Sequence, residues 1–396
     1  MNPAVVVIAY NRPAALSRLL ASLRHAEYPA GAAVPLTISI DRAVDGSSRE
    51  TVATARAFDW PHGPKTVLEQ ESHLGLVAHF RACGRLSRGN GGVVLLEDDL
   101  TVAPPFYAFA SAALGRYREE MDLGGVCLYG LSFNGYSHDP FLPLDDGTDA
   151  FLLQVPYTQG LAFTSAQWQR FESWWDAVPL RPHQGLHPSF LSFGREEWFP
   201  RLSHYLAANQ RFMCFPRVSL TTGWGDAGTH FKERSDWFQA PMQLRPRPYR
   251  LPDVEGPIAY DGFFELLPDR LGALAPHLPH VEFDLDLNAT KQPVNLRQPY
   301  VLTSRPARSA LAGFGLQMYP PERNIIENVG GEALSLARVG DVDWGTWAGA
   351  ATRRRLHAYF WLRNPPSRRR AMRFTAAGLL QTARTMWHER AVRRKP

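Results

Sequence analysis

This sequence of 396 residues has few cysteines and no long apolar segment. The three cysteines, Cys83, Cys127 and Cys214, are odd in number and far apart, so they form neither a disulfide framework nor a zinc-binding spacing. No apolar run is long enough to span a bilayer, and no basic segment or cleavage site precedes the first strand-like run, Ala4–Ile8. We therefore expect a protein of a reducing compartment, the cytoplasm.

Acidic residues are almost missing from the end of the chain. Residues 351–396 contain thirteen Arg or Lys and one acid, Glu389, which gives them a net charge of +12 and leaves −7 for the rest. Residues 367–391 are compatible with a basic amphipathic helix, which would dock the protein peripherally on the inner face of the plasma membrane. A solvated tail and an RNA-binding tail are the alternatives, although we expect no nucleic acid partner.

The composition is that of a globular protein, with 45% hydrophobic and 20% charged residues. The first hundred residues alternate strand and helix patterns, which predicts an α/β fold with a mostly parallel sheet and flanking helices. Strands are expected at 5–9, 36–40, 66–68 and 93–96. We expect three regions: a catalytic domain at 1–240, a proline-rich accessory region at 241–350, and the basic tail at 351–396.

An apolar run, Val93–Leu96, ends abruptly in three acids, Glu97, Asp98 and Asp99. Three carboxylates at the rim of a buried strand are costly unless a positive charge joins them. Mn²⁺ or Mg²⁺ is the economical candidate because both ions prefer hard oxygen ligands. The alternative is an acidic helix N-terminus that follows the strand.

Polar residues also follow the first two predicted strands, with Arg12 after strand 5–9 and Asp41 after strand 36–40. In open α/β sheets ligands bind outside the carboxyl ends of the strands. We therefore expect Arg12, Asp41 and the three acids at one edge of the sheet. The alternatives are a helix N-cap or loop acid for Asp41 and a surface salt bridge for Arg12.

Several motifs in order make the chain resemble GT-A glycosyltransferases. The similarity is greatest to the N-acetylglucosaminyltransferase I family (family 13) and its bacterial family 2-like relatives, and it covers about residues 3–240. The motifs that carry it are Ile8-Ala9-Tyr10-Asn11-Arg12-Pro13, Asp41, Glu97-Asp98-Asp99-Leu100, Val102-Ala103-Pro104-Pro105-Phe106, Gln159–Phe163, Glu196-Glu197-Trp198 and Cys214-Phe215-Pro216 leading to Gly225–His230.

The resemblance implies a role for each residue at the predicted edge. Asp99 would bind the metal that bridges the two phosphates of a nucleotide-sugar. Asp98 would bind the ribose and Glu97 the transferred sugar. Asp41 would pair with uracil, and Arg12 would contact the phosphates.

An inverting transferase also needs a base, and the resemblance places it in the acidic pair before Trp198. Glu197 is the candidate and Glu196 the reserve, although the family pattern has aspartates there. General-base assistance contributes roughly 10²–10⁴ in rate. The alternative is that both are exposed helical glutamates.

The glycine-rich segment Gly225–His230 resembles a loop that folds over the diphosphate, where Thr229 and His230 would reach phosphate or metal. An ordinary surface turn is the alternative. His73 and His79 could lie over the nucleobase, and Trp174 and Trp175 could stack on an acceptor sugar, although a role in packing is the simpler interpretation for each.

The expected function is metal-dependent, inverting transfer of a sugar, N-acetylglucosamine being the favoured one, from a UDP-sugar to a glycan or lipid-linked glycan in polysaccharide biosynthesis. One alternative is a sugar nucleotidyltransferase, whose glycine-rich phosphate loop after the first strand is missing here. The other is a non-catalytic module of the same fold that docks on membranes.

Overall fold

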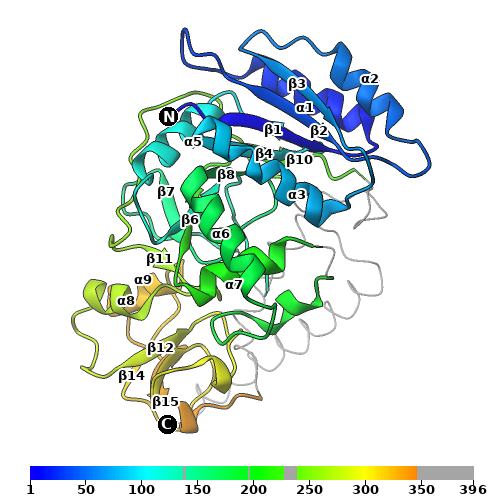
Figure 1. The fold of residues 1–396 in the computed structure, drawn as a ribbon. Helices are drawn as coiled ribbons and strands as arrows, with labels where there is room; N and C mark the ends of the chain where they lie inside the picture. The colour runs from blue at the N-terminus through cyan, green and yellow to red at the C-terminus, as the bar shows by residue number, and fades with distance from the viewer. Residues whose placement is uncertain (137–139, 195–196, 227–238, 346–396) are drawn as a thin grey trace, which may run out of the picture.

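The computed structural model describes residues 1–136, 140–194, 197–226 and 239–345. The fold is built on a nine-stranded sheet with the order β11-β7-β9-β6-β8-β4-β1-β2-β3 (Figure 1). Within the described residues, five of its eight strand pairings are parallel and three are antiparallel. The strands are β1 Ala4–Ala9, β2 Leu36–Ile40, β3 Lys65–Glu69, β4 Gly92–Glu97, β6 Leu123–Cys127, β7 Ala150–Leu153, β8 Leu161–Thr164, β9 Phe212–Pro216 and β11 Ala259–Tyr260.

Helices cover both faces of this sheet, because its central strands are apolar on both sides. In β1, Val5 and Val7 point into one core cluster with the leucines of α1, whereas Val6 and Ile8 point into a second cluster with Phe80. The predicted α/β class, with a mostly parallel sheet between helices, is confirmed. The helices of this region are α1 Pro13–His25, α2 Arg49–Ala57, α3 Leu76–Arg85, α4 Ser87–Asn90, α5 Phe106–Arg116, α6 Ser165–Ala177, η1 Pro188–Ser192 and α7 Phe199–Ala208.

The proline-rich region contributes to the nine-stranded sheet and forms a four-stranded sheet of its own. Its strand β11 pairs with β7 at the edge of the large sheet, and four later strands form a separate sheet with the order β12-β13-β15-β14. Figure 1 shows this second sheet at the opposite end of the molecule from β2 and β3. The remaining elements of the proline-rich region are α8 Pro268–Leu274, β12 Phe283–Asp286, η2 Pro293–Asn295, β13 Tyr300–Thr303, β14 Ala312–Phe314, α9 Glu322–Ile326, β15 Leu334–Arg338 and η3 Val339–Asp341.

A short antiparallel pair positions the chain beyond the acids. Strand β5 (Leu100–Val102) follows Asp99 directly and pairs with β10 (Thr221–Gly223). Residues 224–226 are therefore brought beside the end of β4.

Several predictions fall outside the described residues, namely those on Glu196, Thr229, His230 and the tail at 351–396. The helices of the described part of the chain are all too short or too polar to traverse a lipid bilayer. The three cysteines are buried and free.

Candidate active site

The polar residues predicted at one edge of the sheet do meet there. Strands β2, β1 and β4 are parallel neighbours, so their carboxyl ends lie side by side. The ladder continues past each strand end, because the Asp41 amide donates to the Ala9 carbonyl at 2.9 Å and the Asp98 amide donates to the Ile8 carbonyl at 3.1 Å. This register holds Asp41 and the three acids on either side of the end of β1.

Arg12 lies between two of the acids. Its guanidinium donates one hydrogen bond to Asp98 Oδ1 and another to Asp99 Oδ2, the latter at 3.0 Å. Pro13 starts α1 directly after Arg12, which fixes where the arginine leaves the strand. The surface salt bridge that was the alternative for Arg12 is thus an ion pair with the acids themselves. We call Arg12, Glu97, Asp98 and Asp99 the acid edge.

The acid edge carries more negative charge than its single arginine balances. Burial raises the pKa of Glu97 to about 8, and repulsion from Asp99 and Asp98 adds to this shift. Burial also raises the pKa of Asp98 to about 6, against the attraction of Arg12. The Asp98 side chain is 2% exposed, and its Oδ2 has no hydrogen-bond partner within the described residues.

This arrangement fits a divalent cation that brings its own further ligands. Asp99 is partly exposed, with 32% of its side chain accessible, so it can reach an incoming ion. Carboxylate oxygens are the ligands that Mn²⁺ and Mg²⁺ prefer. In the described parts of the chain, however, no three His, Cys, Asp or Glu side chains together form a metal site.

Asp41 is held by the turn that precedes α3. Its Oδ1 accepts from the amides of Arg42 and Leu74 at 2.9 and 2.8 Å, and its Oδ2 accepts from the Gly75 amide at 2.9 Å. His73 Nδ1 lies 3.0 Å from the same Oδ2. A carboxylate has about four acceptor sites, so a nucleobase would have to displace one of these donors. This is the loop-acid geometry that was the alternative for Asp41.

The ring of His73 lies at this edge and is partly exposed. It packs against the Tyr10 ring at a centroid distance of 5.5 Å. Because Tyr10 follows β1 and His73 precedes α3, the two rings flank the space beside Asp41. This position of His73 is compatible with a nucleobase lying over its ring. The contact of His73 with Asp41 also closes the turn before α3.

Trp198 links the predicted base segment to the acid edge. Its ring is buried and stacks on Phe80 of α3 at 4.3 Å, and its side chain donates a hydrogen bond to Glu97. Glu197 precedes it, is partly buried, and donates its amide to the Gly194 carbonyl at 3.2 Å. The pattern of acids before a tryptophan pointed to Glu197 but gave no hint that Trp198 itself contacts Glu97.

The start of the predicted diphosphate loop also lies at the acid edge. The Trp224 amide donates to the Asp99 carbonyl at 3.2 Å, and its indole N–H donates to Thr101 at 2.5 Å. Arg18 of α1 lies over the Trp224 ring at 4.8 Å and forms an ion pair with Asp226. The chain therefore enters residues 225–230 directly beside the predicted metal ligand.

Comparison with known proteins finds no matching family model and no matching curated protein. Among solved structures, Staphylococcus aureus TarS 1-349 with UDP-GlcNAc is 14% identical over 58% of this chain and 60% of its own, at a TM-score of 0.39. A mannosyltransferase from Pyrobaculum calidifontis with GDP-Man and Mn²⁺ is 14% identical over 55% of this chain and 58% of its own, at 0.34. GalNAc-T7 with UDP, GalNAc and Mn²⁺ is 14% identical over 55% and 42%, at 0.38.

The chain thus spans less than two thirds of the length of these neighbours. Likenesses at such TM-scores identify no family, and the fold described above rests on the strands and helices of this chain. The functional interpretation rests on the acid edge.

Proposed function

We propose that this chain is a GT-A glycosyltransferase that transfers a sugar from a UDP-sugar to a glycan acceptor in a metal-dependent reaction. The observation that carries the proposal is the acid edge, where Asp98 and Asp99 share one arginine beside a third acid, Glu97, at the end of a buried strand. Such a surplus of oxygen ligands suits a divalent cation that arrives with a diphosphate.

Each residue of the acid edge has a proposed task. Asp99 would hold the cation, with the diphosphate oxygens and His230 completing its ligands. Bound there, the cation would neutralise the charge that develops on the leaving diphosphate. Asp98 would hold the ribose and Glu97 the transferred sugar, while Arg12 would contact the phosphates.

The proposed reaction is a single displacement with inversion. The acceptor hydroxyl oxygen bonds to the anomeric carbon, the bond from that carbon to the diphosphate breaks, and UDP leaves. Glu197 takes the proton of the hydroxyl, with Glu196 as the alternative base. We favour N-acetylglucosamine as the sugar and a glycan, lipid-linked at a membrane that the basic tail contacts, as the acceptor.

A panel of donors tests the proposal. Hydrolysis of UDP-, GDP- and dTDP-sugars is measured with and without Mn²⁺ for the full chain and for Asp99→Asn. The control is Asp59→Asn, because Asp59 stands two residues after α2 and is 75% exposed. We expect turnover of a UDP-sugar only with Mn²⁺, a loss of at least about 100-fold in Asp99→Asn, and no change in Asp59→Asn. Absence of metal-dependent turnover or binding with every donor would refute the proposal.

The base is tested separately. Once an acceptor is identified, Glu197→Gln should lower the rate of sugar transfer by a factor of roughly 10²–10⁴ without weakening donor binding. Glu196→Gln is the matched comparison, and a larger loss there would move the assignment to Glu196. Formation of a nucleoside diphosphate sugar and pyrophosphate from a sugar 1-phosphate and a nucleoside triphosphate would instead reveal a nucleotidyltransferase.

A further inference from the structure

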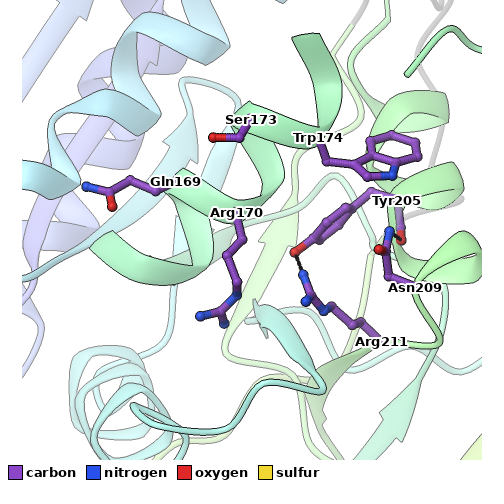
Figure 2. A pocket seen from close by; sticks show the side chains of 7 residues that line it. All are labelled: Gln169, Arg170, Ser173, Trp174, Tyr205, Asn209 and Arg211. Atoms are coloured by element: carbon purple, nitrogen blue, oxygen red, sulfur yellow. Dashed lines mark hydrogen bonds between the residues drawn. The ribbon is translucent and has the colours of Figure 1, made fainter. Parts of the chain in front are cut away.

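A second candidate site lies between α6 and the end of α7. It is a hollow of about 420 Å³, which Figure 2 shows with both arginine side chains reaching below α6 toward the same region. Its volume lies within the range of small-ligand pockets. The residues that line it are Gln169, Arg170, Ser173, Trp174, Tyr205, Asn209 and Arg211. We call it the α6–α7 hollow.

The α6–α7 hollow is separate from the acid edge. Helix α7 starts next to Trp198, which contacts Glu97, and ends next to Asn209 in the hollow. A ten-residue helix is about 15 Å long, so the two sites lie at opposite ends of α7. The directions of the strands lead to the same conclusion. Strands β6 and β9 run in the same direction as β4. Arg211 directly precedes β9, so it lies at the amino ends of these strands, whereas the acid edge lies at the carboxyl end of β4.

The hollow has two guanidinium groups and no carboxylate in its lining. Within the described chain, neither Arg170 nor Arg211 forms an ion pair. Arg170 Nε and Nη2 are buried and have no hydrogen-bond partner among the described residues. Arg211, in contrast, is held in place, since it donates to the Tyr205 hydroxyl and lies over the Tyr205 ring at 5.1 Å.

The other charged side chains of α6, Glu172 and Asp176, are paired, unlike Arg170. On another face of α6, Glu172 is paired with Arg85 and Arg88 at 2.5 and 2.8 Å. Buried donors that stay unpaired are unfavourable, so a ligand that accepts hydrogen bonds from Arg170 would satisfy them. A guanidinium presents its Nε and one Nη side by side, which matches the two oxygens of a carboxylate or phosphate.

The remaining lining groups suit a sugar. Trp174 is half-buried and contacts His204 and Tyr205 edge to face at 5.0 and 5.5 Å. Gln169, Ser173 and Asn209 add amide and hydroxyl groups that can donate to or accept from sugar hydroxyls. Basic residues also lie near His204, which contacts Trp174. Burial lowers the pKa of His204 to about 4, and His183, Arg181 and Arg201 add to this shift.

We propose that the α6–α7 hollow binds an anionic sugar, with its phosphate or carboxylate on Arg170 and Arg211 and its ring beside Trp174. The site acts independently of the acid edge and needs no divalent cation. The inference therefore stands or falls separately from the proposed glycosyl transfer.

Calorimetric binding in EDTA tests this proposal on the full chain. The probes are glucose 1-phosphate, glucuronate, glucose and inorganic phosphate. We expect one or both anionic sugars to bind at least ten times more tightly than glucose, and which one binds distinguishes a phosphate from a carboxylate ligand. Binding of neither, or binding of inorganic phosphate as tightly as of the sugar phosphate, would overturn the proposal.

Variants assign the binding to the hollow. The double variant Arg170→Gln with Arg211→Gln should weaken binding of the anionic sugar at least tenfold. Trp174→Leu should weaken binding of the anionic sugar while leaving binding of inorganic phosphate unchanged. Arg118→Gln, at an arginine that is 69% exposed and outside the hollow, is the control. Asp99→Asn should bind as the unaltered chain does. Undiminished binding in the double arginine variant would overturn the proposal.

Discussion

The acid edge can be compared with a second cluster of buried charges, which lies where β11 meets the four-stranded sheet. In this second cluster Arg305 Nε contacts Asp286 at 2.9 Å, and Lys291 Nζ contacts Asp261 at 2.6 Å. Burial raises the pKa of the remaining acid, Glu265, well above its usual value. We call these five residues the paired network.

The two clusters differ in the source of their counterions. In the paired network two carboxylates meet two cations of the same chain, and the Asp286 and Arg305 side chains are almost fully buried. At the acid edge two carboxylates, Asp98 and Asp99, meet one arginine, Glu97 is the remaining acid, and Asp99 is partly exposed. Burying a charge without a partner is costly, so we expect a cluster that serves stability alone to have its charges balanced, as in the paired network. The acid edge is organised for a cation from outside.

The largest effect on stability is expected from breaking the paired network. Arg305→Met would leave Asp286 without a cation and should lower the free energy of unfolding by about 3–5 kcal/mol. Urea unfolding at pH 7 measures this loss. Arg308→Met, at an exposed arginine nearby, is the control and should change the value by less than about 0.5 kcal/mol. A loss below about 1 kcal/mol for Arg305→Met would mean that the network does not act as described.

Acid should weaken the region under the acid edge through His79. This histidine of α3 is buried with Nε2 2.7 Å from Ser39 Oγ, and burial lowers its pKa to about 4. Because the unfolded chain binds the proton near pH 6.5, His79 by itself should lower the free energy of unfolding by about 3 kcal/mol as the pH falls from about 6.5 to 4. The raised pKa values of Glu97 and Asp98 act in the opposite direction, so the effect of His79 is the difference in pH dependence between the unaltered chain and His79→Gln. Unfolding at a series of pH values tests this, and an equally steep fall in His79→Gln would contradict it.

A smaller loss is expected from the turn that holds Asp41. Gly75 has φ +74° and ψ 163°, a region that is almost restricted to glycine. No atom lies within 4 Å of the position a Cβ would take, so Gly75→Ala should cost only the backbone strain, about 1–3 kcal/mol.

The matched control is Gly272→Ala inside α8, where the added Cβ is also uncrowded and φ is helical. It should stabilise the protein by about 0.5–1 kcal/mol. Equal thermal midpoints for the two variants would show that the turn before α3 tolerates other conformations.

The first hundred residues could be predicted because their signals are local. Leu16, Leu19, Leu20 and Leu23 repeat at helical spacing, and the apolar run before Glu97 is the buried strand β4. Arg12 and Asp98 then meet because parallel strands end at one edge. This reasoning needed no knowledge of side-chain packing.

The rest depended on contacts between distant segments. Trp198 reaches Glu97 across about a hundred residues, and the turn at 73–75, which follows β3, reaches Asp41. The strands of the second sheet have three to five residues each and lie among prolines, so they lack a clear alternation. Arg170 and Arg211 come from separate elements, and no motif joins them.

The measurement that tests the account most directly is the effect of Mn²⁺ with UDP on the thermal unfolding of the unaltered chain and of Asp99→Asn. At about 100 times its dissociation constant, the complex should stabilise the unaltered chain by about 2.7 kcal/mol. Without metal, Asp99→Asn should be at least as stable as the unaltered chain, because it removes repulsion at the acid edge, and Mn²⁺ with UDP should not stabilise it further. Equal stabilisation of both proteins, or of neither, would contradict the central claim.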